Sequence, residues 1–143
     1  MRLSPLTIII SSLLVTACGG GSDDTNSAPV ISSAIGIADS SANGTIETSE
    51  SFNLLLKITD ADNDTVTGSV ELNGASVSLT AYTGNEDYSH QASLSLDAFG
   101  DYTATITASD GANTDVTSSY ELVVIPNNTE VQTQLEADIA NFV

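Results

Sequence analysis

Positive charge is nearly missing from this chain of 143 residues, which has 2 Lys and Arg residues, 19 Asp and Glu residues and a formal net charge of −17. A chain with so few cations cannot neutralise phosphates and release their counterions, so nucleic acid is excluded as a partner. For the same reason it cannot attach electrostatically to an anionic lipid surface. Hydrophobic residues still make up 41% of the chain, which predicts a folded protein rather than a disordered acidic tail.

The side chains that usually carry catalysis are also scarce. The chain has no Trp, one cysteine at Cys18 and one histidine at His90, so it lacks the ligands of a zinc site and the partners of a disulfide. His90 lies in an alternating segment, where a packed or edge position is expected rather than the role of a catalytic base. Neither a G-x-S-x-G motif nor a phosphate-binding glycine motif occurs. We therefore predict a protein that is not an enzyme.

The chain begins with features of an export signal. Residues 1–17 contain Arg2, an apolar run and small residues, and the run is too short to span a bilayer. Residues Val15–Cys18 resemble a bacterial lipobox, which implies cleavage before Cys18, attachment of a lipid such as palmitate to Cys18 and anchoring in the cell envelope. Gly19 after that cysteine implies the outer membrane by the same resemblance. An ordinary secretory signal with an incidental Cys18 is the alternative.

Residues 18–28 form a tether rich in Gly, Ser and Asp, and strand-like segments follow it. Seven segments with apolar residues at alternate positions occupy 29–37, 51–59, 65–73, 75–82, 88–96, 101–109 and 116–125. Their number and spacing predict an all-β fold over residues 29–125, an immunoglobulin-like β-sandwich of seven strands, with a small barrel as the alternative. Asn73-Gly74 predicts a tight hairpin, and Tyr102 is expected to form a tyrosine corner or to be an ordinary half-buried strand residue.

The pattern changes in residues 126–143. Val131, Leu135, Ile139 and Phe142 recur at helical spacing, which predicts a short amphipathic helix over 129–143. Thr129 and Gln132 suggest a capping box at its start. Such a short helix is marginal alone, so its apolar side needs a cover. The sandwich, a partner or a further domain could supply that cover.

An acidic loop between the second and third expected strands is the main candidate site. Asp60, Asp62 and Asp64 alternate along it and repel one another unless a cation lies among them. In a sandwich of this type the loop that contains Asp110 and the linker that contains Asp24 and Asn26 lie at the same end. Oxygen atoms are the ligands that Ca²⁺ prefers, so these six residues are the predicted metal ligands.

The segments Ala28–Ile31, Ile58–Asp64 and Gly100–Gly111 resemble those of bacterial cadherin-like and polycystic-kidney-disease-type (PKD-like) immunoglobulin-fold repeats. The resemblance covers nearly all of residues 28–125. It implies Ca²⁺ bound by Asp60, Asp62 and Asp110 with help from the linker, and a function in cell adhesion. Two other interpretations remain for the loop. It could be an EF-hand ending at Glu71, although Thr65 stands where glycine is needed, or a solvated acidic turn.

The expected role is binding, spacing or adhesion at the cell envelope, with a cell-surface protein or a glycan as partner. Tyr82 and Tyr88 flank a loop and could form a small platform for a sugar, which would make the domain an accessory carbohydrate-binding unit. Ordinary loop-edge packing of the two rings is the alternative. The chain could also be the N-terminal part of a larger surface protein.

Overall fold

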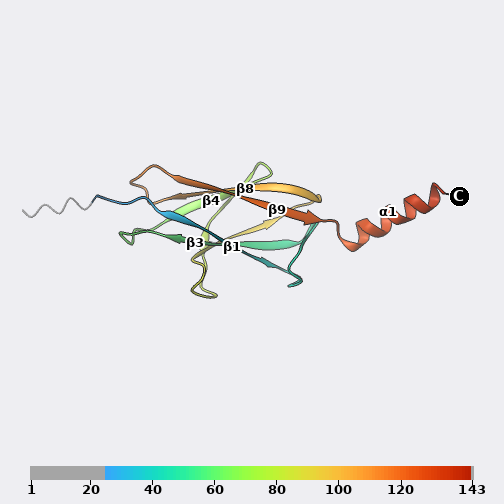
Figure 1. Cartoon of the computed structure of the whole chain (residues 1–143), viewed down its shortest axis with the longest axis horizontal. Coiled ribbons are helices and arrows are strands. Elements are labelled where there is room, and N and C mark those ends of the chain that lie inside the picture. Colours follow the sequence, from blue (N-terminus) through green and yellow to red (C-terminus); the bar gives the residue numbers. More distant parts are fainter. Residues whose placement is uncertain (1–24, 143) are drawn as a thin grey trace, which may run out of the picture.

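The computed structural model describes residues 25–142, in which two β-sheets face each other and one helix extends from their end (Figure 1). The strand order is β1-β3-β7-β6 in one sheet and β2-β9-β8-β4-β5 in the other. All paired strands are antiparallel except β2 and β9. The elements are β1 (Val30–Asp39), β2 (Ile46–Glu47), β3 (Ser51–Thr59), β4 (Thr67–Leu72), β5 (Ala75–Ser78), β6 (Thr80–Ala81), β7 (His90–Ser95), β8 (Gly100–Ser109), β9 (Val116–Ile125) and α1 (Asn128–Ala140).

The core lies between the two sheets and is built from the alternate residues of their strands. Phe52, Leu54 and Leu56 of β3 are completely buried, and they belong to one apolar cluster with residues of β4, β8 and β9 such as Ile106 and Leu122. Because each sheet contributes one apolar face to a shared interior, the fold is an all-β sandwich. The small barrel considered from the sequence is therefore wrong.

The expected strands all occur, but one of them is divided. Residues 75–82 form β5, which pairs with β4, and β6, which pairs with β7 of the opposite sheet. The chain changes sheets at Leu79, whose N–H donates to the carbonyl of Gly68 at 2.9 Å. Together with the two-residue β2, this division gives nine strands instead of seven in the described part of the chain. The alternation of apolar and polar residues could not reveal the division of residues 75–82, because this alternation continues without a break where the chain changes sheets.

Two local predictions are confirmed. Asn73 and Gly74 both have positive φ angles, of 52° and 76°, as a two-residue turn between β4 and β5 requires. The hydroxyl of Tyr102 donates to the carbonyl of Ala98 at 2.8 Å and thereby closes the corner between β7 and β8. The ring of Tyr102 packs against the core, so the residue forms the expected tyrosine corner.

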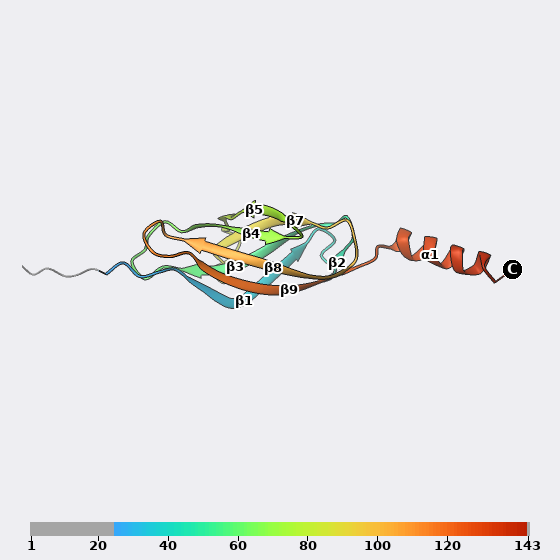
Figure 2. The same ribbon diagram turned by 90° about the horizontal axis from the view of Figure 1, so that it is seen from above.

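The helix α1 is present but begins earlier than predicted. Asn127 is its N-cap and forms a capping box with Glu130, so the assignment of Thr129 and Gln132 was wrong by two residues. Asparagine is as good an N-cap as threonine, and the sequence pattern did not separate them. None of the helical residues is buried, and α1 extends away from the sandwich rather than folding onto it (Figure 2). Within residues 25–142 no helix has the length and apolar character needed to cross a bilayer.

Candidate functional site

Three segments that are distant in the sequence meet at one end of the sandwich, which we call the linker end. They are the linker before β1, the loop between β3 and β4, and the loop between β8 and β9 (Figure 1). The side-chain amide of Asn26 donates to Oδ2 of Asp110 at 3.1 Å, and the N–H of Ser27 donates to Oδ2 of Asp62 at 2.7 Å. The predicted convergence of linker and loops is thus present in the structure.

Asp60 organises the loop between β3 and β4. Its Oδ1 accepts hydrogen bonds from the N–H groups of Asp62 at 2.9 Å and Asp64 at 3.1 Å. Asn63 adopts a positive φ of 62°, which lets the chain reverse tightly around this carboxylate. Across residues 25–142, Oδ2 of Asp60 is the buried side-chain oxygen that accepts no hydrogen bond. One oxygen of this carboxylate is therefore hydrogen-bonded within its own loop, whereas the other has no hydrogen-bond donor among the described residues.

Asp110 organises the loop between β8 and β9 in a more complete way. Its Oδ1 accepts from the N–H groups of Ala112 at 2.9 Å and Asn113 at 2.8 Å, and its Oδ2 accepts from the side-chain amides of Asn113 at 2.8 Å and Asn26 at 3.1 Å. The side-chain and backbone hydrogen bonds of Asn113, with the N–H of Ala112, lower the pKa of Asp110 to about 2. This carboxylate is ionised at neutral pH and held by neutral donors.

Asn113 is a site residue that the sequence analysis did not select. Its side-chain amide also donates to the carbonyl of Asn26 at 3.1 Å, so it ties the linker to the β8–β9 loop. The available signal was its position three residues after Asp110 in a turn that contains Gly111, because such a turn brings an Asn side chain back toward an Asp.

The predicted ligands are not all brought together. Asp60, Asp62, Asp110 and Asn26 share the linker end, and an open pocket of about 320 Å³ beside them is lined by both Asp60 and Asp64 together with Asn63 and His90. Asp24 and Cys18 lie outside the described residues. In the part of the chain that is described, no group of three or more His, Cys, Asp or Glu side chains is arranged to hold a metal ion.

The flanking structure excludes the EF-hand interpretation of the acidic loop. An EF-hand needs a helix on each side, but β3 precedes this loop and β4 follows it. Glu71, the expected twelfth residue of that motif, lies on β4 and pairs with Ser76 and Thr105.

Tyr82 and Tyr88 contact each other but do not form an open platform. Their ring centroids are 6.2 Å apart and the rings are nearly perpendicular, at 74°. Each ring also lies against a glycine, because a side chain at Gly36 would collide with Tyr88 and one at Gly84 would collide with Tyr82. The rings thus pack the β6–β7 loop, and they do not present the flat pair of faces that sugar stacking needs.

Comparisons with protein-family models, with curated proteins and with solved structures found no match to this chain. The fold and the geometry of the linker end are therefore the features from which a function can be inferred.

Proposed function

We propose that this chain is a non-enzymatic, lipid-anchored binding or spacer module of the bacterial cell envelope. In this proposal the sandwich is immunoglobulin-like and cadherin-like, Cys18 carries the lipid, and Ca²⁺ binds at the linker end. The observation that carries the calcium part of the proposal is the buried oxygen of Asp60 that has no hydrogen-bond partner among residues 25–142.

A buried carboxylate oxygen without a partner is costly, because it loses its hydration and receives nothing in exchange. The carboxylates of Asp62 and Asp110 belong to the same end of the sandwich and add negative charge there. A hard cation would remove both penalties, since Ca²⁺ takes six to eight oxygen ligands and accepts carboxylate, amide and main-chain oxygens. These residue types suit Ca²⁺ by their chemistry, with Asp60 and Asp62 as its expected carboxylate ligands and main-chain or amide oxygens needed to complete the set.

The expected effect of the ion is mechanical. Asn26 and Ser27 already connect the linker to the loops of Asp110 and Asp62. A cation held by Asp60 and Asp62 would fix the β3–β4 loop, and through the bond from Ser27 to Asp62 it would fix the direction in which the linker leaves the sandwich. The module would then stand at a defined orientation on its lipid-anchored tether, as suits a spacer or an adhesive domain.

The test is a calorimetric Ca²⁺ titration of the purified protein, combined with thermal melts in Ca²⁺ and in chelator. If Ca²⁺ binds only the folded state, a concentration 100 times the dissociation constant should stabilise it by about 2.7 kcal/mol. The variant Asp60→Asn, which keeps the shape of the side chain but not its charge, should lose both the heat of binding and the stabilisation.

Asp97→Asn is the matched control, because Asp97 is an exposed aspartate near the opposite end of the sandwich, after β7. It should behave like the unmodified protein. The absence of heat and of stabilisation would contradict the calcium proposal, and so would an equal loss in both variants.

A further inference from the structure

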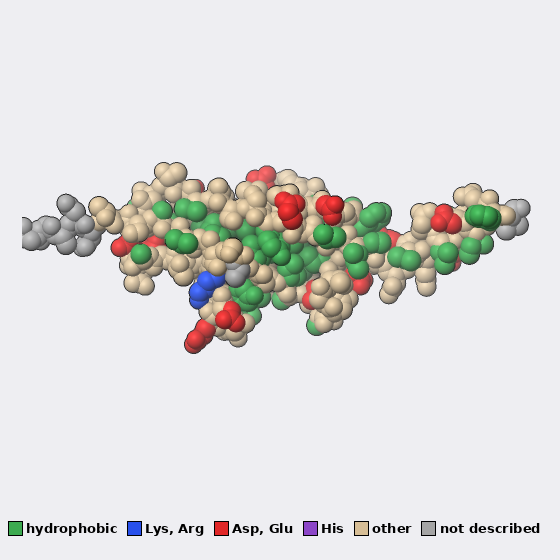
Figure 3. Space-filling view, in the orientation of Figure 1, with side chains coloured by type: hydrophobic (Ala, Val, Ile, Leu, Met, Phe, Trp, Pro, Cys, Tyr) green, Lys and Arg blue, Asp and Glu red, His purple; other side chains and the backbone are tan. Residues whose placement is uncertain are grey.

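The helix α1 exposes a row of large apolar side chains. Val131, Leu135 and Ile139 are 51%, 58% and 56% exposed, and Phe142 follows just beyond the helix. Consecutive members of this row are three or four residues apart in the sequence, so their side chains form one apolar stripe along the helix. Hydrophobic side chains are visible along α1 in the space-filling view (Figure 3). We call these four residues the α1 stripe.

The base of α1 is fixed to the sandwich although its stripe is exposed. Thr48 is a buried residue beside β2, and its hydroxyl donates to Oε2 of Glu130. The same hydroxyl accepts from the N–H of Asn127 at 3.1 Å, while the side chain of Asn127 accepts from the N–H of Glu130 at 3.0 Å. This network sets the direction of the first turn. A partner that binds the stripe would thus meet a helix that is already oriented, which lowers the entropic cost of binding.

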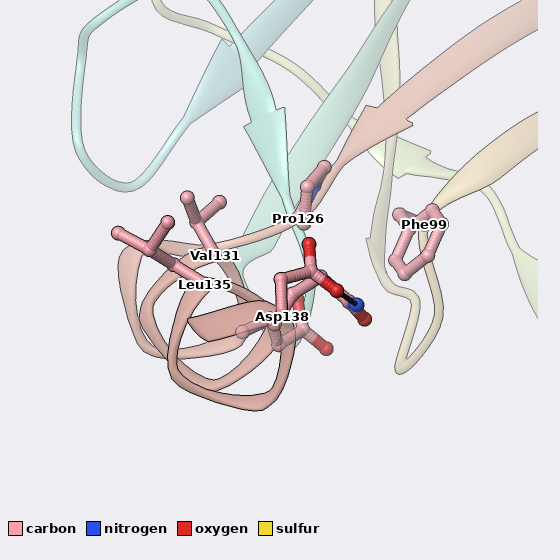
Figure 4. A pocket seen from close by; sticks show the side chains of 7 residues that line it. Phe99, Pro126, Val131, Leu135 and Asp138 are labelled. Carbon is pink, nitrogen blue, oxygen red and sulfur yellow. Dashed lines mark hydrogen bonds between the residues drawn. The ribbon is translucent and has the colours of Figure 1, made fainter. Parts of the chain in front are cut away.

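The sandwich contributes an apolar wall beside the first turns of the helix. Phe99, in the corner between β7 and β8, is 62% exposed and faces the helix across an open pocket of about 330 Å³ (Figure 4). Pro126, Val131 and Leu135 line the same pocket. Glu130, Gln134 and Asp138 line it as well, and Figure 4 shows Asp138 on the side of α1 toward Phe99 while Val131 and Leu135 point to the other side. The hollow between Phe99 and α1 is therefore lined by both apolar and acidic side chains.

Acidic side chains border the α1 stripe, and no cation does. By helical geometry Asp138 and Glu136 lie on opposite sides of the stripe, and residues 128–142 contain no Lys, Arg or His. The last turn of α1 carries no basic residue, so the negative end of the helix dipole is not compensated within the described chain. A segment that fills the hollow would need apolar side chains for the stripe and positive charge for its borders.

We propose that α1 and Phe99 form a docking surface for a cationic amphipathic segment of another protein. A second copy of this chain is a poor occupant, because beyond residues 1–17 its one Lys or Arg is Lys57, whose Nζ donates to the carbonyl of Glu86 at 2.6 Å. An anionic bilayer is excluded by the same charge argument. This proposal does not depend on calcium at the linker end, which involves different residues.

The test measures binding of the purified protein to synthetic helical peptides by fluorescence anisotropy. The probe is an amphipathic peptide of leucine and lysine, about 14 residues long so that it matches the length of α1. Two matched peptides replace either lysine by glutamate or leucine by serine. The leucine–lysine peptide should bind best, the other two at least about tenfold more weakly, and added salt should weaken the binding.

Leu135→Asp separates docking from simple charge attraction. If the stripe is the docking surface, this variant should bind the leucine–lysine peptide at least about tenfold more weakly, because a buried leucine contact is lost. Attraction by charge alone would make the same variant bind more tightly, since it adds a negative charge. Val123→Asp is the control, because Val123 of β9 is as exposed, at 62%, but lies outside this surface.

Several results would overturn the proposal. One is unchanged or tighter binding by Leu135→Asp, and another is an equal loss of binding by Val123→Asp. Equal binding of the leucine–glutamate peptide would exclude a cationic partner. Dimers in sedimentation experiments, or binding to neutral phosphatidylcholine vesicles, would assign the surface to a second copy or to lipid if Leu135→Asp abolished them.

Discussion

Asp110 illustrates how neutral donors stabilise a carboxylate where cations are missing. Four N–H groups, from Ala112, Asn113 and Asn26, surround its two oxygens. They hold its pKa at about 2, below the ordinary value of 3.8. Because the folded state binds its proton more weakly than the unfolded state, the ionised form of Asp110 stabilises the fold.

This stabilisation has a defined pH range. It should be fully present above pH 3.8, the unfolded value, and should be lost as the pH falls through about 2, where the folded carboxylate takes up its proton. Asp110→Asn should therefore melt at a lower temperature than the unmodified protein at neutral pH. The difference between the two should shrink between about pH 4 and pH 2, as measured by circular dichroism in chelator.

Asp115→Asn serves as the control in the same β8–β9 loop, because Asp115 is exposed. Its effect on the melting temperature should be small, because Asp115 is exposed. A difference between Asp110→Asn and the unmodified protein that stays constant down to pH 2 would contradict the role given to Asp110.

At the site, the sequence predicted positions better than contacts. The convergence of Asp62, Asp110 and Asn26 followed from the fold class, because the loops concerned lie at one end of any such sandwich. The partners of these side chains did not follow. Asn113 and the N–H of Ser27 make specific bonds that depend on how each turn closes, and a single sequence does not encode turn closure as a simple pattern.

Among the elements, long strands with strict alternation were predictable to within a few residues. The predicted range 51–59 is identical to β3, and 116–125 is identical to β9. Inward and outward side chains alternate along most of both strands, although β9 fully buries only Leu122 and Val124. The short strands β2 and β6 were not resolved from the sequence. A strand of two residues is too short to show an alternation of apolar and polar side chains, and the pairing of β2 and β6 is decided by tertiary contacts.

The helix α1 depends on the sandwich only at its base, which makes that base testable. Thr48→Val keeps the size of a buried side chain but removes the hydroxyl that joins Asn127 and Glu130. The expected loss is about 1 kcal/mol for the helix. Hydrogen exchange of the α1 amides should then accelerate about fivefold, while the exchange of β3 and β8 stays unchanged.

Thr45→Val provides the comparison, because Thr45 is an exposed threonine in the same segment and bonds locally to Asn43. It should leave the exchange of α1 unaffected. Equal protection of α1 in the Thr48 and Thr45 variants would mean that the helix does not need its polar base.

For the whole molecule, the arrangement of the ends matters most. The linker lies at one end of the sandwich, and α1 leaves from the opposite end (Figures 1 and 2). If Cys18 carries a lipid, the calcium site would be near the membrane and the α1 stripe would be presented on the far side. Anchor, spacer and docking surface would then follow one another along the long axis.

The anchor can be tested in cells. Cys18→Ser removes the thiol that a lipid would occupy, so the protein should move from the membrane fraction to the soluble fraction, and metabolic labelling with palmitate should be lost. Ser22→Ala, in the same tether, should change neither result. Persistent membrane association of Cys18→Ser without labelling would contradict lipid anchoring through this residue.

The placement of β1 and β9 also determines how the sandwich would respond to a pull between its two ends. Such a force runs along the strands, and antiparallel hydrogen bonds lie perpendicular to the strands. The bonds between β1 and β3 would be loaded together in shear instead of being opened one after another from the end. Resistance to pulling would thus come from whole strands acting at once.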